Sequence, residues 1–495
     1  MSIALLLALA PFILFLILLL WKKTSLLTAA VGALLLFTVC VIFYWHIEPL
    51  LLSISYAKGF LIALDIFVII FGAIFFLAVL KELHILDSVS YYLQSFSADY
   101  RVQLVVLAWF FGNFLEGTAG FGTPVAVVAP LLIAIGISPI RALAIGLLGN
   151  SVAGVFGAAG TPIRVGFSGL DVASVPMLGA LFNFVGILIP VFMIWIAAGE
   201  RKEKMREFVA AVPFALWSGG VFFIASLVSV FLGQEFPSIV GSMIGLLIVF
   251  VTTKRGWFVP KKSISLFEHQ PEQKAIMSVS KAFSPYVLLV VLLLVGKFVL
   301  GSVGVTISSI KHAIGLFNPG FVFILIGIVV LIGWKRFAYF VVPSAKSAFK
   351  GAMVPFLIIG CTSTLVQLLI NSGVNTSGVS SGLSIIARYF EVSWLPLIAP
   401  FAGAFGSFVT GSVTISNIMF GSFLSISAET LGMPVGLILA LALVGGAVGN
   451  MIALADMIAG EAVVGVKNKE RDILKLVILP CLLCLALVGI VGMLV

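Results

Sequence analysis

Stretches of about 20 apolar residues recur from one end of this chain to the other, and they constrain its fold more than any other feature. Each stretch is long enough to cross the hydrocarbon core of a bilayer as a helix. Only 9% of the 495 residues are charged, against roughly a quarter in soluble domains. The chain is therefore predicted to be an all-α polytopic membrane protein. The first stretch is too long for a secretory signal and no basic region precedes it, so we expect it to be retained.

The apolar stretches predict about 12 transmembrane helices. They lie at 3–21, 25–44, 60–80, 139–160, 176–199, 209–231, 238–253, 283–300, 318–333, 343–370, 433–456 and 472–494. Two further stretches, 103–137 and 393–428, are interrupted near the middle by glycines and polar residues. We predict re-entrant hairpins there, which enter and leave the membrane on the same side, because non-helical backbone at membrane depth needs protein or water around it.

The basic residues test this arrangement, because Lys and Arg concentrate in cytoplasmic loops. If the N-terminus is outside and neither hairpin crosses, nearly all of the 28 Lys and Arg residues lie in cytoplasmic loops. The exceptions are Lys58, Arg164, Lys297, Lys311 and Arg388. The N- and C-termini are then both predicted outside the cell membrane.

The longest polar segment, 254–281, is predicted to be a cytoplasmic loop between two halves of the chain. The first half, 1–253, contains the hairpin entered from the cytoplasm, and the second half, 282–495, contains the hairpin entered from outside. The net charge of +9 comes from loop residues that set topology and meet anionic lipid, so no nucleic-acid partner is predicted.

The two interrupted stretches resemble each other. In "FGNFLEGTAGFGTP" (111–124) and "FGSFVTGSVTISNI" (405–418), Phe, Gly, Phe and Gly occur at the same positions. Further along each half a Gly-Asn pair follows, with Asn150 in "GLLGNSVAG" and Asn450 in "GGAVGNMIA". Since the hairpins are entered from opposite sides, we predict two inverted repeats whose hairpin tips face each other near the midplane. Broken helices in corresponding places of inverted halves indicate a transporter binding site.

The residue types at the tips predict that this site binds an anion. A hairpin tip exposes backbone N–H groups at a helix N-terminus, where the helix dipole favours negative charge. Glycine lets a ligand approach the backbone closely, and hydroxyl and amide groups add donors without charge. The alternative is that these glycines and asparagines only pack helices together. The predicted ligands of a small carboxylate are Gly117, Thr118, Gly120, Gly122, Thr123, Asn150, Gly411, Ser412, Thr414, Ser416, Asn417 and Asn450.

Three carboxyl groups within the apolar stretches are candidates for proton coupling, because a charge is costly in hydrocarbon. Glu116 is the first of them, since it lies at a hairpin tip and a low dielectric disfavours its charged form. It could instead be an ionised partner of Arg141 or Arg164. Asp65 could extend to the outer surface, and Asp456 could be a solvated cap near the cytoplasmic end of its span.

The segments "FLEGTAGFGTPVAV" and "GNSVAGVFGAAGTPI" resemble the lactate permease family of bacterial and archaeal carriers. The resemblance implies uptake of L-lactate, D-lactate or glycolate by proton symport, and a fold of inverted repeats with hairpin tips, as in the ion-transporter superfamily. The second tip departs from the family's pattern. Val413 in "GSVTISN" stands at an acidic position, and Asn450 stands where the family tends to have lysine. Both departures bear on the substrate and on the coupling ion.

Taken together, these features predict a secondary active transporter for a small monocarboxylate, a 2-hydroxy acid such as lactate or glycolate, driven by protons. A sodium-coupled or dicarboxylate carrier of the same architecture is one alternative, with Asn150 and Asn450 as Na⁺ ligands. An ion channel with glycine-rich filter loops is another. No enzyme, cofactor or metal site is predicted, because no paired catalytic groups or metal-ligand cluster occurs. The oligomeric state and the type of domain movement stay open.

Overall fold

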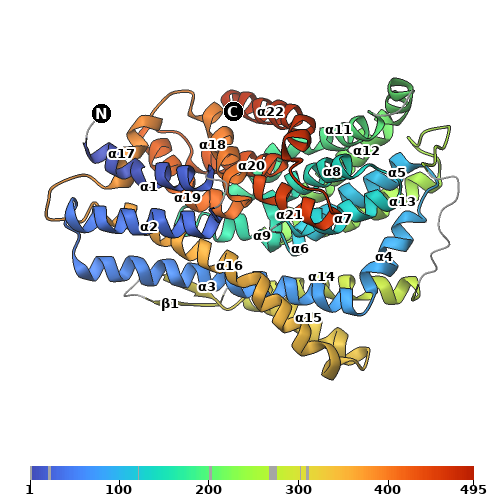
Figure 1. The fold of residues 1–495 in the computed structure, drawn as a ribbon, viewed down its shortest axis with the longest axis horizontal. Coiled ribbons are helices and arrows are strands. Elements are labelled where there is room, and N and C mark those ends of the chain that lie inside the picture. Colours follow the sequence, from blue (N-terminus) through green and yellow to red (C-terminus); the bar gives the residue numbers. More distant parts are fainter. Residues whose placement is uncertain are drawn as a thin grey trace.

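A computed structural model describes residues 3–20, 24–120, 122–199, 203–266, 276–301, 303–307 and 312–495. Helices make up nearly all of it, and several of the longest run roughly along the horizontal axis of Figure 1. The first half contains α1 (Ile3–Leu20), α2 (Leu26–Phe43), α3 (Pro49–Glu82), α4 (Ile85–Gln94), α5 (Tyr100–Leu104), the π-helix η1 (Val105–Phe111), α6 (Gly112–Thr118), α7 (Thr123–Ala134), α8 (Pro139–Ser151), η2 (Val152–Phe156), α9 (Gly157–Arg164), α10 (Val175–Phe182), η3 (Asn183–Leu188), α11 (Ile189–Ala198), α12 (Lys204–Ser229), η4 (Val230–Leu232) and α13 (Pro237–Lys254).

The second half is also helical apart from one small hairpin of strands. It contains α14 (Val279–Leu300), β1 (Gly304–Ile307), β2 (His312–Gly315), α15 (Pro319–Gly333), α16 (Phe337–Asn371), α17 (Gly382–Ala387), η5 (Arg388–Phe390), α18 (Leu395–Thr410), α19 (Val413–Thr430), α20 (Val435–Gly449), η6 (Asn450–Ile452), α21 (Leu454–Val464) and α22 (Glu470–Leu494). The antiparallel pair β1–β2, with Gly304 opposite Gly315, was not predicted from the sequence.

Ten helices in the described part of the chain are long and apolar enough to cross a membrane. They coincide with ten of the predicted spans, and the other two predicted spans, 3–21 and 318–333, coincide with the shorter apolar helices α1 and α15. Large apolar side chains such as Phe43, Phe231 and Phe298 are mostly exposed, as expected where lipid replaces water. The chain is therefore a multi-pass membrane protein.

The two predicted spans that contain the Gly-Asn pairs lie at the centre of the molecule. In the most apolar part of the first, Pro139–Arg164, 100% of the residues are buried, and in that of the second, Val435–Val464, 89% are buried. In α14 only 22% of the corresponding residues are buried. The long helices α3 and α16 pack along each other outside this centre, and α15 and α2 pack against them. The pair α3–α16 approaches closely at Gly59, where an added methyl group would lie 2.7 Å from the Thr364 backbone.

Basic residues that were predicted to share a side of the membrane lie together in the structure. Arg141, Lys204 and Lys475, all predicted cytoplasmic, line one cavity of about 430 Å³. Arg164 and Lys297, both predicted external, contact the same residue, because Arg164 donates to the Phe317 carbonyl and the Lys297 ammonium lies over the Phe317 ring. Residues that were predicted to share a side are therefore close together in the fold.

Candidate functional site

The tip of the first predicted hairpin is a break between two helices. Helix α6 ends at Thr118, the backbone passes through Gly120 and Gly122 with positive φ angles of 59° and 73°, and α7 begins at Thr123. Residues other than glycine adopt this left-handed conformation only at a cost. Because Pro124 takes the second position of α7, where its missing N–H is harmless, the local sequence favours a new helix start here.

The tip of the second predicted hairpin has the same construction. Helix α18 ends in a left-handed Gly411, and the Ser412 hydroxyl then accepts a hydrogen bond from the Ile415 N–H at the start of α19. This is the usual serine N-cap, which satisfies a backbone donor at a helix start. Both tips therefore place a helix N-terminus inside the protein.

The two central spans are broken as well. In the first, α8 passes into η2, and the backbone then turns through Ala158, Ala159 and Gly160, all with positive φ, before α9 continues. In the second, α20 passes into η6, and an extended Ala453 precedes α21. The apolar stretches 139–160 and 433–456 were each predicted to be one transmembrane helix, and both breaks correct that prediction.

Each half supplies a tip that touches the broken span of the other half. A methyl group on Gly154 in η2 would lie 3.2 Å from the Val413 side chain at the second tip, and one on Gly122 at the first tip would lie 2.7 Å from Oδ1 of Asp456 in α21. Likewise, η2 packs on α20 while η6 packs on α8. The Asn417 amide of α19 also donates to the Pro162 carbonyl of α9 at 2.9 Å. The four breaks therefore converge on one region.

Glu116 lies within this region, and no ion pair joins it to a cationic group among the described residues. Its residue surface is 4% exposed, and Oε2 has no hydrogen-bond partner among the described residues. A methyl group on Gly157, at the break in the central span, would lie 2.5 Å from Glu116 Oε1, and one on Gly120 would lie 3.4 Å from it. The carboxyl group is thus enclosed by two glycines at two helix breaks.

Asp456 lies close to Glu116, and the two carboxyl groups interact electrostatically. Asp456 is 6% exposed, and its Oδ2 has no hydrogen-bond partner among the described residues. The alternative that Asp456 is a solvated cap is therefore wrong. The reason is that the break at Ala453 turns the first turn of α21 towards the hairpin tips instead of towards a membrane surface.

Further buried polar atoms lie without partners on the same elements. Both polar atoms of the Asn113 and Asn150 amides lack hydrogen-bond partners in the described part of the chain, as do Oδ1 of Asn450, Oδ1 of Asn417 and Oγ of Ser407. Buried polar groups in proteins are nearly always hydrogen-bonded, and exceptions call for a bound water, ion or ligand. The convergence of the breaks is therefore a candidate binding site.

The predicted ligands fall into two groups in the structure. Asn150, Asn417 and Asn450 keep atoms without partners in the described part of the chain, and Gly120, Gly122 and Gly411 lie beside the two carboxyl groups. The other side chains already make local hydrogen bonds or contacts, and the Thr123 side chain lies outside the described residues. Thr118 donates to the Leu115 carbonyl, Ser416 donates to the Gly403 carbonyl, Gly117 packs against Ser238 and Ile239 of α13, and Thr414 is buried in the first turn of α19.

Asn113 and Ser407 were not predicted as site residues. They occupy equivalent positions in "FGNF" and "FGSF", each polar inside an otherwise apolar repeat, and each has an unpartnered polar atom. Asn113 also precedes Glu116 by three residues, which places both on one face of a helix. Both residues could have been predicted from the comparison of 111–124 with 405–418, because each is the polar residue at the same position of the two segments.

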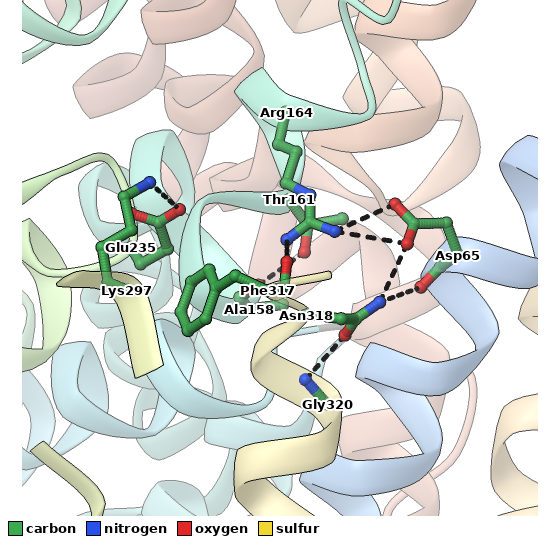
Figure 2. A network of polar contacts seen from close by, with 9 residues as sticks. All are labelled: Asp65, Ala158, Thr161, Arg164, Glu235, Lys297, Phe317, Asn318 and Gly320. Carbon is green, nitrogen blue, oxygen red and sulfur yellow. Dashed lines mark hydrogen bonds and ion pairs between the residues drawn. The ribbon is translucent and has the colours of Figure 1, made fainter. Parts of the chain in front are cut away.

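Arg164 and Arg141 are occupied away from Glu116. Figure 2 shows the Arg164 guanidinium against Asp65 of α3, at 3.2 Å from each carboxylate oxygen, with the Asn318 amide donating to the same carboxylate at 2.9 Å. Arg141 donates to the Ile196 carbonyl. Neither arginine is the partner of Glu116, and Asp65 lies in an ion pair that joins α3 to α9 and to the start of α15.

Broken helices that meet in corresponding places of two halves are typical of helical membrane transport proteins. Comparison of the sequence with protein families gives the particular family. The model described as L-lactate permease matches residues 4–303 and 297–495, so the chain belongs to the L-lactate permease family. This confirms the resemblance found in the motifs.

Individual relatives agree with this membership. The L-lactate permease of Bacillus subtilis is 30% identical over 80% of this chain and 78% of its own length. The L-lactate permease of Salmonella typhimurium is 28% identical over 92% of this chain and 88% of its own length. The glycolate permease GlcA of Escherichia coli is 27% identical over 81% of this chain and 79% of its own length.

Proposed function

We propose that the chain is a secondary active transporter of the cell membrane that takes up a small monocarboxylate, a 2-hydroxy acid such as lactate or glycolate, by proton symport. The observation that carries the proposal is Glu116, a buried carboxyl group at the convergence of helix breaks, with no cationic partner in the part of the chain that the structure describes. The names of the relatives, L-lactate permease and glycolate permease, support a 2-hydroxy acid as substrate.

The substrate carboxylate binds at the tips, around residues 117–123 and 411–417. Helices α7 and α19 both begin there, and helix N-termini favour anions through their N–H groups and their dipole. Among the described residues, the unpartnered amides of Asn113 and Asn150 and the unpartnered Oδ1 of Asn450 supply donors and acceptors for the carboxylate and the 2-hydroxyl group. Glu116 carries the coupling proton.

Transport requires that the site open to each side of the membrane in turn. The reciprocal contacts of η2 with α20 and of η6 with α8 support two inverted repeats. The distribution of Lys and Arg supports placing both termini outside. We assign the moving part to the hairpins and broken spans, and the frame to α3 and α16, which pack along each other.

Substrate counterflow in proteoliposomes tests this function. Vesicles loaded with unlabelled lactate should accumulate labelled lactate or glycolate transiently, and a panel of mono- and dicarboxylates ranks the substrates. Failure of every carboxylate to exchange would reject the proposal. Replacing Na⁺ by choline separates proton from sodium coupling, an alternative that the unpartnered oxygens of Asn150 and Asn450 support, since Na⁺ prefers such ligands.

The topology gives the first prediction. Single cysteines at Lys204 and Lys335 should react with an impermeant thiol reagent only from the cytoplasmic side, and one at Arg388 only from outside. The native cysteines are buried or half-buried and are replaced first. Labelling of 204 and 388 from the same face would contradict the inverted arrangement.

Thr118→Val gives the second prediction. The substitution keeps the shape of the side chain, and the Leu115 carbonyl keeps its bond from the Ala119 N–H at 2.8 Å, so folding should be preserved. When the hydroxyl turns from the Leu115 carbonyl to donate to the substrate carboxylate, it makes a bond whose loss costs about 1.5–3 kcal/mol, or roughly ten- to hundredfold in affinity. Equilibrium binding of labelled lactate measures the change.

The matched control is Thr362→Val in α16, whose hydroxyl makes the same kind of bond to its own helix far from the site in sequence. Affinity should be unchanged in this variant. Equal losses in both variants would assign the effect of Thr118→Val to packing.

A further inference from the structure

Asp456 stands at the place where the two hairpin tips meet. A methyl group added to Gly122 at the first tip would lie 2.7 Å from Asp456 Oδ1, and one added to Gly411 at the second tip would lie 3.5 Å from the same atom. A single carboxylate oxygen therefore lies against both tips. Both tips are also helix starts that attract an anion.

We infer that the ionised Asp456 side chain occupies the anion site of the empty carrier and competes there with the carboxylate of the substrate. The inference rests on the proposed function, in which the substrate carboxylate binds between the tips. Asp456 and a 2-hydroxy acid carry the same group, so the tips that bind one also bind the other. The substrate anion enters when Asp456 takes up a proton and becomes neutral.

Glu116 is placed differently. Its Oε1 lies beside Gly157 and Gly120, both in the first half of the chain, whereas Asp456 Oδ1 lies beside a glycine of each tip. Asp456 is the carboxyl group that touches both tips. Glu116 therefore carries a proton next to the anion site, whereas Asp456 occupies the site itself.

The charges around Asp456 favour this competition. Helices α7, α8, α18 and α22 pack against α21, and neither α7 nor α18 contains a charged residue. On α8, Arg141 donates to the Ile196 carbonyl. On α21 itself, Glu461 accepts a bond from the Lys469 N–H at 2.8 Å.

The charged residues of α22 lie in its first turns, where Asp472 pairs with Lys469 and Lys475 at 3.6 and 3.7 Å. Glu470 and Arg471 occupy the same first turn.

Glu116 on α6 is then the titratable group that interacts with Asp456. A substrate anion beside the ionised Asp456 would add a second negative charge there, so neutralising Asp456 both vacates the tips and removes that repulsion.

This competition links the proton to the substrate. One proton moves from water to the Asp456 carboxylate for each substrate anion that replaces it between the tips, and no other bond changes. Because binding is reciprocal, a ligand that requires a bound proton loses about tenfold in affinity for each unit of pH above the titration of that group. Competition by the ionised Asp456 side chain therefore prevents the substrate from binding unless Asp456 is protonated.

The experiment measures binding of labelled L-lactate to the purified full-length carrier between pH 5 and 9, for the wild type, Asp456→Asn and Asp456→Ser. In the wild type, affinity should fall as the pH rises. In both neutral variants, each unit of pH should reduce the affinity for lactate about tenfold less than it does in the wild type. At pH 9 these variants should bind lactate more tightly than the wild type does. Serine is smaller than aspartate and needs no additional room, so it provides a second neutral variant if Asn disturbs the fold.

The outcomes separate this inference from the proposed function. Tighter binding at high pH in either neutral variant supports the competition. Binding that is weaker at every pH with an unchanged pH dependence would assign Asp456 a structural role and overturn it. A wild type that binds neither lactate nor glycolate at any pH would instead reject the proposed function.

Discussion

Uphill uptake driven by a pH gradient is expected to collapse in Glu116→Gln, whereas exchange of internal for external substrate continues. Glutamine has the shape of the protonated glutamate, so the loaded carrier should still bind substrate and change conformation. Net uptake needs the empty carrier to return after it releases its proton, and the variant has no proton to release at this position. Both modes are measured in the same proteoliposomes, with and without an imposed pH gradient.

Glu235→Gln is the matched control for this prediction. Glu235 is as deeply buried as Glu116 but accepts from the Lys297 ammonium at 2.8 Å, in the separate pair drawn in Figure 2. Removing its charge leaves Lys297 without that partner, which destabilises the fold and should lower both transport modes together. If Glu116→Gln behaved in this way, its role would be structural. Normal accumulation in Glu116→Gln would move the coupling proton to Asp65 or Asp456.

The positions of the membrane spans could be predicted because they depend on local composition alone. The ends of the spans were less predictable. Helix α3 begins at Pro49 rather than near residue 60, because a proline at the first position starts a helix even though the following turns contain Ser53 and Lys58. Helix α4, an amphipathic segment of ten residues, was missed because it is too short to resemble a span.

The broken central span shows what local sequence does not contain. Of the three residues in "GAAGTP" with a left-handed backbone, only Gly160 is a glycine, and Ala158 and Ala159 have positive φ angles of 42° and 52°. An alanine in this conformation costs about 1–2 kcal/mol, so the break must be held by tertiary packing. One such contact is with the Gln234 backbone, 2.9 Å from where a methyl group on Gly160 would lie.

The parts of the candidate site that lie in the two repeated motifs could be predicted from the sequence. The tips, Glu116 and the two Gly-Asn pairs follow from the motif and its second copy, and Asn113 and Ser407 could have been found in the same way. The location of Asp456 could not, because it has no counterpart in the quoted motifs and its distance from the tips depends on how α21 packs against α7 and α18.

The second large effect is expected from Gly122→Ala, which should reduce transport far more than its backbone strain alone allows. Gly122 has a φ of 73°, and a left-handed alanine costs about 1–2 kcal/mol. The added methyl group would also lie 2.7 Å from Asp456 Oδ1, a distance that real Cβ atoms do not show, so either the tip or the carboxyl group must move. Initial rates of lactate uptake, normalised to the amount of carrier in the membrane, measure the effect.

Gly169→Ala separates the two causes. Gly169 has a similar φ of 85°, but nothing lies within 4 Å of the position of an added methyl group, so this variant has the backbone strain without the contact. Uptake should be close to normal in Gly169→Ala and reduced more than roughly tenfold in Gly122→Ala, the change expected for a further 1.4 kcal/mol. Adding Asp456→Ser to Gly122→Ala removes the carboxyl oxygen that the methyl group meets, and should restore part of the substrate exchange. If exchange stays absent in the double variant while Gly169→Ala is active, the first tip needs its glycine for close approach of the substrate rather than of Asp456.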